Sequence, residues 1–248
     1  MPSVTRFPAG LSTSPVGQLL GNFRDPNPVH VHVLESDWDT YAAADWTITT
    51  TTGSNALQAA DGGILRLSTS ATSSDIQAIQ KNPAAFKFTN GCQFWFGVLF
   101  AINTNATAVF RAGLMTGGTV LAPTDGVYFS KAAAGAIDFN IKTGGSTTTL
   151  SSVVAAPTDG TYMALGFYYD GNPVTPRIHI FSSQGMTLPS FPTNTNGNTG
   201  GREVTQTSTL TNLPTSILAP TFAIQTSTAA IRTLDLDYFV VGNEIVRF

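Results

Sequence analysis

The chain has 248 residues, of which 42% are hydrophobic and only 11% charged, and its formal net charge is −3. Soluble domains usually contain roughly 25% charged residues, and charge is depleted where protein surfaces are buried against partners. The small net charge provides no electrostatic footprint for nucleic acid or for an anionic membrane surface, so we expect neither as a partner. The single cysteine, Cys92, excludes an intramolecular disulfide framework and a zinc ribbon.

Residues 1–28 differ from the rest of the chain. They are rich in proline and glycine and show no sustained hydrophobic period. Proline fixes φ and removes a backbone donor, so the segment predicts an extended amino-terminal arm rather than a folded element. Two interpretations stay open: a disordered terminus, or an arm that becomes ordered on a neighbouring subunit.

From Val29 onward, apolar and polar residues alternate with a period of two, which is typical of strands that are covered on one face. Threonine is abundant, and its branched Cβ favours strands. The pattern predicts an all-β fold, a single β-sandwich domain of jelly-roll type over residues 29–248. The clearest strands are expected at 46–49, 64–68, 94–102, 137–141 and 234–241.

Glycine-containing turn signals separate these strands. They lie at residues 61–63, 117–118, 125–126, 144–145, 159–160 and 170–172. One Pro-Thr-Asp-Gly motif occurs twice, within residues 122–128 and 156–162, and two equivalent hairpin entries explain it. The Gly-, Pro-, Ser-, Thr- and Asn-rich stretch 183–216 predicts a long loop, of the kind used for binding or left disordered.

The strongest catalytic candidate is the run Glu35, Asp37 and Asp39. Carboxylates at i, i+2 and i+4 of a strand share one face, the spacing that retaining β-glucanases use for nucleophile and acid. Here the run ends in aspartate, which is shorter than the glutamate of the glucanase run, and it lies where a strand ends. An acidic turn explains it more simply, so we expect no catalytic residue here and no enzyme.

Other chemistry is equally sparse. His30, His32 and His179 could share a metal, but polar-face histidines are the simpler interpretation. Asp235 and Asp237 fit a solvated strand face. No nucleophile elbow and no phosphate-binding loop occurs in the sequence. We therefore expect no cofactor and no metal site.

Several short segments resemble a family of bacteriophage virion structural proteins. They are Thr5–Gly10, Leu34–Tyr41, Ala44–Thr49, Ala60–Leu65, Ser74–Gln80, Phe86–Phe88, Gly91, Phe94–Phe96, Asp125–Lys131, Leu165–Gly171 and Leu234–Phe239. Members of that family look like concanavalin- or laminin-G-type sandwiches. The resemblance implies such a sandwich, with the last strand returning beside the first, and transfers no catalytic residue.

Within a phage particle, three roles compete. The first is a capsid decoration (cement) protein that binds the major capsid protein. It is expected to be a trimer on the capsid surface of a virion that is made in the bacterial cytoplasm. The second is a tail-fibre or receptor-binding lectin, with the 183–216 loop touching glycan, and a distant third is a glycan depolymerase. The arm residues expected to bind the capsid or a sister subunit are Arg6, Phe7, Pro8, Leu11, Leu19, Leu20 and Phe23.

Overall fold

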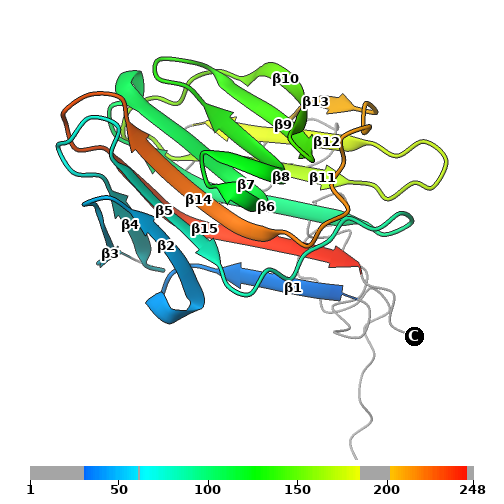
Figure 1. Ribbon diagram of the computed structural model, residues 1–248, viewed down its shortest axis with the longest axis horizontal. Coiled ribbons are helices and arrows are strands. Elements are labelled where there is room, and N and C mark those ends of the chain that lie inside the picture. The colour runs from blue at the N-terminus through cyan, green and yellow to red at the C-terminus, as the bar shows by residue number, and fades with distance from the viewer. Residues whose placement is uncertain (1–30, 61, 185–201, 245–248) are drawn as a thin grey trace, which may run out of the picture.

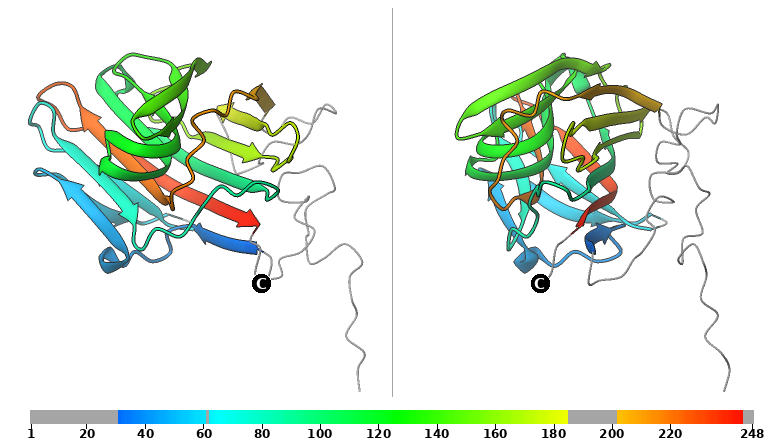
Figure 2. Two further views of the ribbon diagram at one scale, coloured as in Figure 1. Left: turned by 45° about the vertical axis from the view of Figure 1, so that its right-hand side comes forward. Right: turned by 90° about the vertical axis from the view of Figure 1, so that its right-hand side faces the viewer.

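The computed structural model describes residues 31–60, 62–184 and 202–244. These residues form two antiparallel β-sheets that pack face to face (Figures 1 and 2). The described helical elements are two short 3-10 turns, η1 (Ala43–Asp45) and η2 (Asn105–Thr107). The predicted all-β sandwich is confirmed.

One sheet has eight strands, in the order β13-β12-β11-β6-β15-β4-β3, with β1 also paired to β15. The last long strand therefore lies beside the first, as the family resemblance implied. The strands are β1 (Val31–Ser36), β3 (Ser54–Gln58), β4 (Ile64–Ser68), β6 (Phe94–Ile102), β11 (Met163–Tyr169), β12 (Ile178–Gln184), β13 (Arg202–Thr207) and β15 (Thr233–Glu244).

The other sheet has seven strands, in the order β10-β9-β8-β7-β14-β5-β2. Successive antiparallel pairings join β7 to β8, β8 to β9 and β9 to β10, while β14 enters from the far end of the chain. The strands are β2 (Trp46–Thr50), β5 (Ile76–Lys81), β7 (Ala108–Thr119), β8 (Ala122–Lys131), β9 (Ile137–Thr143), β10 (Ser146–Val154) and β14 (Ala219–Thr226).

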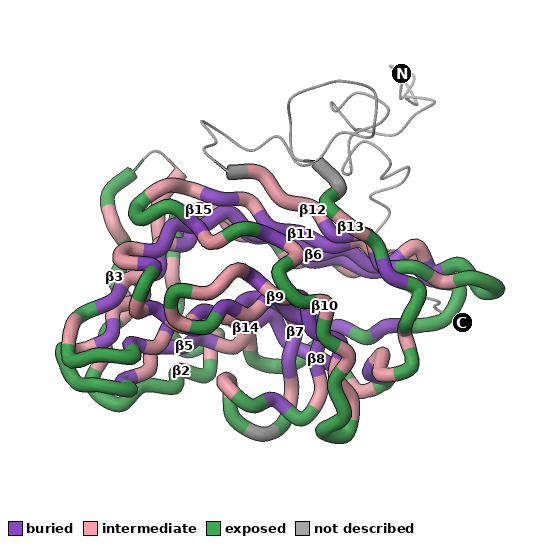
Figure 3. The backbone as a smooth tube through the Cα atoms, turned by 90° about the horizontal axis from the view of Figure 1, so that it is seen from above, coloured by how far each residue is buried: buried purple, intermediate pink, exposed green. Residues whose placement is uncertain are grey.

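The core lies between the two sheets, where the buried stretches of both concentrate (Figure 3). Strand alternation explains how it is filled: Ile137, Phe139 and Ile141 of β9 are fully buried, while Asp138 between them points outward. All nine residues of β6 are buried, so the expected buried strand at 94–102 is confirmed. That strand lies in the middle of its sheet, between β11 and β15.

Two expected turns are wrong. Gly117–Gly118 lies within β7, and Asp125–Gly126 lies within β8, so the first Pro-Thr-Asp-Gly copy is strand, while the second lies between β10 and β11. Pro123 is tolerated there because β9 pairs with β8 only from Gly126 onward, which leaves the Pro123 position without a ladder partner on that side.

The stretch 183–216 is also not loop throughout. Strand β13 lies inside it and extends the eight-stranded sheet by pairing with β12. Strand β13 contains threonines and a valine, which favour strands, although the stretch as a whole is rich in turn- and loop-forming residues.

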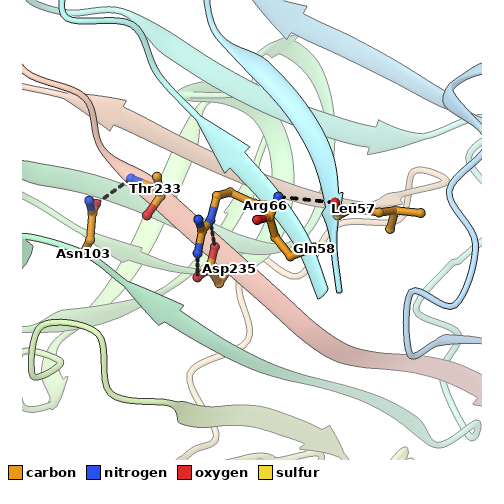
Figure 4. Close-up of polar contacts among 6 residues, drawn as sticks. All are labelled: Leu57, Gln58, Arg66, Asn103, Thr233 and Asp235. Carbon is orange, nitrogen blue, oxygen red and sulfur yellow. Dashed lines mark hydrogen bonds and ion pairs between the residues drawn. The ribbon is translucent and has the colours of Figure 1, made fainter. Parts of the chain in front are cut away.

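A cross-strand ion pair joins β4 to β15 (Figure 4). The Arg66 guanidinium donates from Nε and Nη2 to the two carboxylate oxygens of Asp235, each at 2.7 Å. This hydrogen-bonded contact raises the pKa of Arg66. Asp235 is therefore an ion-pair partner rather than only part of a solvated face.

The Asp235→Asn variant is expected to lower the free energy of unfolding by about 1 kcal/mol, because it removes the charge from a two-point pair whose acid is 17% exposed. The matched control is Asp45→Asn. The Asp45 carboxylate lies 3.3 Å from Lys81 and is 61% exposed, so that change is expected to have no measurable effect. Urea denaturation measures both, and equal effects would contradict the prediction.

Candidate binding faces of the two sheets

A row of polar side chains crosses the outward face of the seven-stranded sheet. Its positions are directly opposite one another in successive strands, from β2 to β10. We call this set the polar row: Thr47, Gln80, Thr221, Tyr128, Asn140 and Thr149, with Gly113 at the position between Thr221 and Tyr128. Adjacent strands lie about 4.8 Å apart, so the row spans the whole sheet.

Hydrogen bonds hold the polar row in place. Gln80 donates from Nε2 to Thr221 Oγ1 at 2.9 Å and to the Met115 carbonyl at 3.1 Å. On the other side, Thr149 Oγ1 donates to Asn140 Oδ1 and Asn140 Nδ2 donates to the Ser130 hydroxyl, both at 2.9 Å. The row is thus a set of uncharged groups fixed by hydrogen bonds to one another, and within it Thr221, Tyr128 and Asn140 are only 0–6% exposed.

Arg111 and Tyr128 form the centre of this face. The Arg111 guanidinium lies 5.4 Å from the centroid of the Tyr128 ring, within cation–π range. Two glycines make room for the ring, since a Cβ at Gly113 would overlap the Tyr128 Cα and Cβ, and one at Gly126 would lie 3.0 Å from Tyr128 Cδ1. At Gly113 the φ of 152° also favours glycine.

The Arg111 side chain has no ionic partner among the described residues. Its Nε is buried and forms no hydrogen bond, and neither described ion pair includes it. Burial lowers the pKa of Arg111 and raises that of Tyr128. Neither residue belongs to a recognisable sequence motif. The alternation Phe110, Arg111, Ala112 could have indicated an outward cation, but not its isolation from carboxylates.

Carboxylates are scarce on this face. Among the described strand positions that point outward from the seven-stranded sheet, the one acid is Asp138 on β9, whose Oδ1 accepts a hydrogen bond from the Ser152 amide at 2.7 Å. Glycoside hydrolysis of the common kind needs two carboxyl groups about 5–10 Å apart. The described part of this face does not present such a pair.

The structure separates the run Glu35, Asp37 and Asp39. Strand β1 ends at Ser36, and Trp38, with φ of 59°, turns the chain and buries its indole in the core. The three carboxylates therefore do not share a strand face, as their spacing would have required. The acidic turn that the sequence favoured is what the structure contains.

Glu35 and Asp37 instead lie near the last strand. Glu35 Oε2 accepts a hydrogen bond from the Tyr238 hydroxyl at 3.3 Å, and burial together with Glu35 raises the pKa of that tyrosine. Asp237 sits at a register shift of β15. Burial and the charge of Asp37 raise the pKa of Asp237.

The two described histidines lie on opposite faces of the eight-stranded sheet. His32 packs edge-on against the buried Phe86, 4.7 Å between ring centroids, whereas His179 points outward beside Tyr168. The polar-face interpretation is thus wrong for His32, because its ring turns toward the core. His30 lies outside the described residues, and no group of three metal-ligating side chains occurs within them.

Cys92 is 6% exposed and lies two residues before the start of β6. Burial, and to a lesser extent the charge of Glu244, raises the pKa of its thiol. A thiol kept protonated in this way is a poor nucleophile. Its burial fits a small side chain that packs in the core.

The outward face of the eight-stranded sheet has a different chemistry. We call its apolar side chains the outer apolar face: Val33, Trp95, Leu99, Ala101, Tyr168, Phe181 and Val240. The Trp95 indole lies over Gly242, where a Cβ would overlap it. Leu99, Ala101 and Val240 are only 2–5% exposed although they point away from the core, whereas Val33 at the sheet edge is 45% exposed.

The predicted arm residues Arg6, Phe7, Pro8, Leu11, Leu19, Leu20 and Phe23 lie outside the described residues. Residues 185–201, which belong to the expected loop 183–216, also lie outside the described residues. Their predicted binding roles stay predictions. No helix in the described ranges has the length and apolar character needed to cross a bilayer.

No protein-family model matches the sequence, and no curated protein matches it. Solved structures do match. Peanut lectin aligns with a TM-score of 0.57 and 9% identity, over 88% of this chain and 99% of the lectin. The β-glucanase of Bacillus licheniformis aligns with a TM-score of 0.53 and 11% identity, over 87% of this chain and 98% of the enzyme.

A protein of unknown function from Shewanella oneidensis MR-1 also aligns, with a TM-score of 0.55 and 13% identity, over 89% of this chain and 90% of that protein. At these identities the likeness shows the fold alone. The chain therefore has a concanavalin-like, lectin-type jelly roll, which confirms the architectural part of the predicted resemblance. The phage assignment stays a prediction.

Proposed function

We propose that the protein is a non-catalytic virion component, a capsid decoration protein that binds the major capsid protein of a bacteriophage and braces its shell. The observation that carries this proposal is the outer apolar face. Outward strand positions that face solvent are normally polar, whereas here Trp95, Leu99 and Val240 occupy the centre of the sheet. Trp95, Leu99 and Val240 are only 2–5% exposed in the single chain, so the part of this face that is open to a partner is its apolar edge at Val33, which is 45% exposed.

The point where the chain enters the described sheet supports the same proposal. The chain enters the eight-stranded sheet at Val31, which lies opposite Glu244. Two residues later, Val33 lies opposite Gly242, which in turn lies opposite Trp95. Residues 1–28 thus precede the edge of the outer apolar face. At ~3.3 Å per extended residue, an arm of this length could reach a neighbouring subunit up to about 90 Å away. We propose that the subunits form a trimer held partly by this exchange.

The chemistry of the other sheet favours a structural role over a depolymerase. A depolymerase would need two carboxylates around one substrate, and among the described outward strand positions of that sheet only Asp138 is acidic. The run Glu35, Asp37, Asp39 is divided by the buried Trp38. A lectin-like module is the second candidate, supported by the alignment with peanut lectin.

A capsid-binding experiment tests the proposal. The probe is a set of purified capsids of the phage that encodes the protein, assembled without it, and binding is measured by co-sedimentation. Deleting residues 1–28, or introducing Val33→Glu on the exposed edge of the outer apolar face, is expected to weaken binding at least about tenfold, since a charge placed in an apolar interface must be desolvated.

The matched control is Ile48→Glu on strand β2. Ile48 is 41% exposed and Val33 45%, and both are apolar residues of edge strands, but β2 belongs to the other sheet. Ile48→Glu is expected to bind like the parent. If the deletion and Val33→Glu both bind as tightly as the parent, or if the parent does not bind capsids, the decoration role is wrong.

A further inference from the structure

Strands β2 and β3 leave one end of the sandwich open. They are outermost strands of the two sheets and lie at the same end of the molecule (Figure 1). Ile48 of β2 lies opposite the buried Ile79, and Leu57 of β3 lies opposite the buried Leu65, so both side chains point toward the core. Ile48 is nevertheless 41% exposed and Leu57 43%. This end therefore presents apolar side chains that the described fold leaves partly uncovered.

The backbone edge of β2 is open as well. Its one described pairing is with β5, so the ladder groups on its other side are available. Natural edge strands are usually protected by a charge, a proline or a bulge, and β2 contains no charged residue, no proline and no register shift. The opposite edge strand of the same sheet, β10, is interrupted by a bulge between Leu150 and Val154. Strand β2 is therefore suited to accept another strand.

The connection between β2 and β3 is held firmly in place. The Thr52 amide donates to Asp75 Oδ1 at 3.2 Å, and the Gly53 amide donates to Thr50 Oγ1 at 2.9 Å. Asp75 is 2% exposed, and a Cβ at Gly53 would overlap the Ser68 carbonyl oxygen. Because the edge is fixed by its own fold, pairing with a partner would order few further groups.

We propose that β2 pairs antiparallel with the β2 strand of a second copy of the chain, across a two-fold axis at Ile48. An isologous contact requires a surface that complements itself. The sequence Thr47, Ile48, Thr49 reads the same in both directions, so each Thr47 would lie opposite a Thr49 and the two Ile48 side chains opposite each other. Threonine pairs and β-branched pairs are favourable cross-strand neighbours.

The distribution of charge favours a second copy as the occupant. The charged residue nearest to Ile48 along the chain is Asp45, and its carboxylate already lies 3.3 Å from Lys81 Nζ. In the antiparallel pair, the two Asp45 residues would be separated by six strand positions, about 20 Å, which is about twice the Debye length at 0.1 M salt. Like charges are thus kept apart. This contact goes beyond the proposed capsid role and lies on the other sheet from Val33.

Disulfide trapping of the full chain tests the axis. Residues that face each other in an antiparallel pair have Cα atoms about 4.5–5.5 Å apart, which suits a disulfide. Ile48→Cys is expected to form a covalent dimer under mild oxidation at least about tenfold faster than Ala56→Cys. Ala56 is the exposed central residue of β3 and would lie on the axis if β3 paired instead. The native Cys92 is 6% exposed. Equal rates, or a faster reaction of Ala56→Cys, would overturn the assignment to β2.

Sedimentation equilibrium measures the association without a cross-link. The average mass of the parent is expected to be at least twice that of Ile48→Glu, because this change places two carboxylates face to face at the axis. The matched control is Val174→Glu, at a residue that is 84% exposed between β11 and β12 of the other sheet, and it is expected to associate like the parent. Equal masses for the parent and Ile48→Glu would overturn the proposal, as would association that is lost on deleting residues 1–28 but kept in Ile48→Glu.

Two further measurements separate this contact from folding and from the capsid role. Ile48→Glu is expected to keep the circular dichroism spectrum of the parent, since the side chain lies at an exposed edge, and to sediment with capsids. A variant that binds capsids normally but no longer associates with itself would support the two-fold contact. A parent that binds capsids but does not associate with itself would remove the two-fold contact alone and leave the capsid role in place.

Discussion

Replacing Phe167 with alanine is expected to lower the free energy of unfolding by about 4 kcal/mol, the range found when a fully buried phenylalanine is truncated in a well-packed core. Phe167 lies on β11 of the eight-stranded sheet and is fully buried. Its ring contacts aromatic rings of both sheets, with centroid distances of 5.4 Å to Phe96 and 5.5 Å to Phe139. Truncation would therefore leave a cavity between the layers and remove several aromatic contacts at once.

Guanidinium chloride denaturation followed by tryptophan fluorescence measures the change. The matched control is Val174→Ala, which truncates a side chain that is 84% exposed and is expected to change stability by less than about 0.5 kcal/mol. A loss below about 1 kcal/mol for Phe167→Ala would mean that this aromatic cluster does not hold the two sheets together.

Replacing Lys131 with methionine is expected to cost about 3 kcal/mol, because it leaves buried carbonyls without donors. Lys131 ends strand β8, is 1% exposed, and turns its ammonium inward. Nζ donates to the carbonyl oxygens of Asn105, Ala108 and Ala132 at 2.6, 2.8 and 3.0 Å. One side chain thus ties the η2 turn to the start of β7 and to its own strand. Lys87→Met, at an exposed lysine, is the control and is expected to be neutral.

The same lysine gives the protein a specific pH dependence. Burial lowers the pKa of Lys131 to about 8, against 10.5 in an unfolded chain. Between these values the unfolded state holds the proton more tightly, so the contribution of Lys131 to stability rises from about pH 8 to 10.5 and is lost as the pH falls through 8. The difference in unfolding free energy between the parent and Lys131→Met should therefore grow from pH 7.5 to 9.5. A constant difference would contradict the lowered pKa.

Much of the fold could be predicted from local sequence. The alternation at 137–141 and 234–241 and the apolar run 94–102 correspond to β9, β15 and β6, because the side-chain period of a strand is a local property. Turn residues were less informative. The same Pro-Thr-Asp-Gly letters form strand at one place and the link between β10 and β11 at another, since strand pairing overrides local turn preference.

The sequence by itself determined the all-β class, the low charge and the absence of catalytic motifs. Only the tertiary structure decided which side chains share a face. The row through Gln80, Thr221 and Tyr128 joins strands that are far apart along the chain, and Gln80 and Thr221 are 141 residues apart. Whether Arg111 has a counter-charge depends on what β14 and β8 place beside it. Register between distant strands is set by packing of the whole sandwich, and so the isolation of that cation could be found only in the folded molecule.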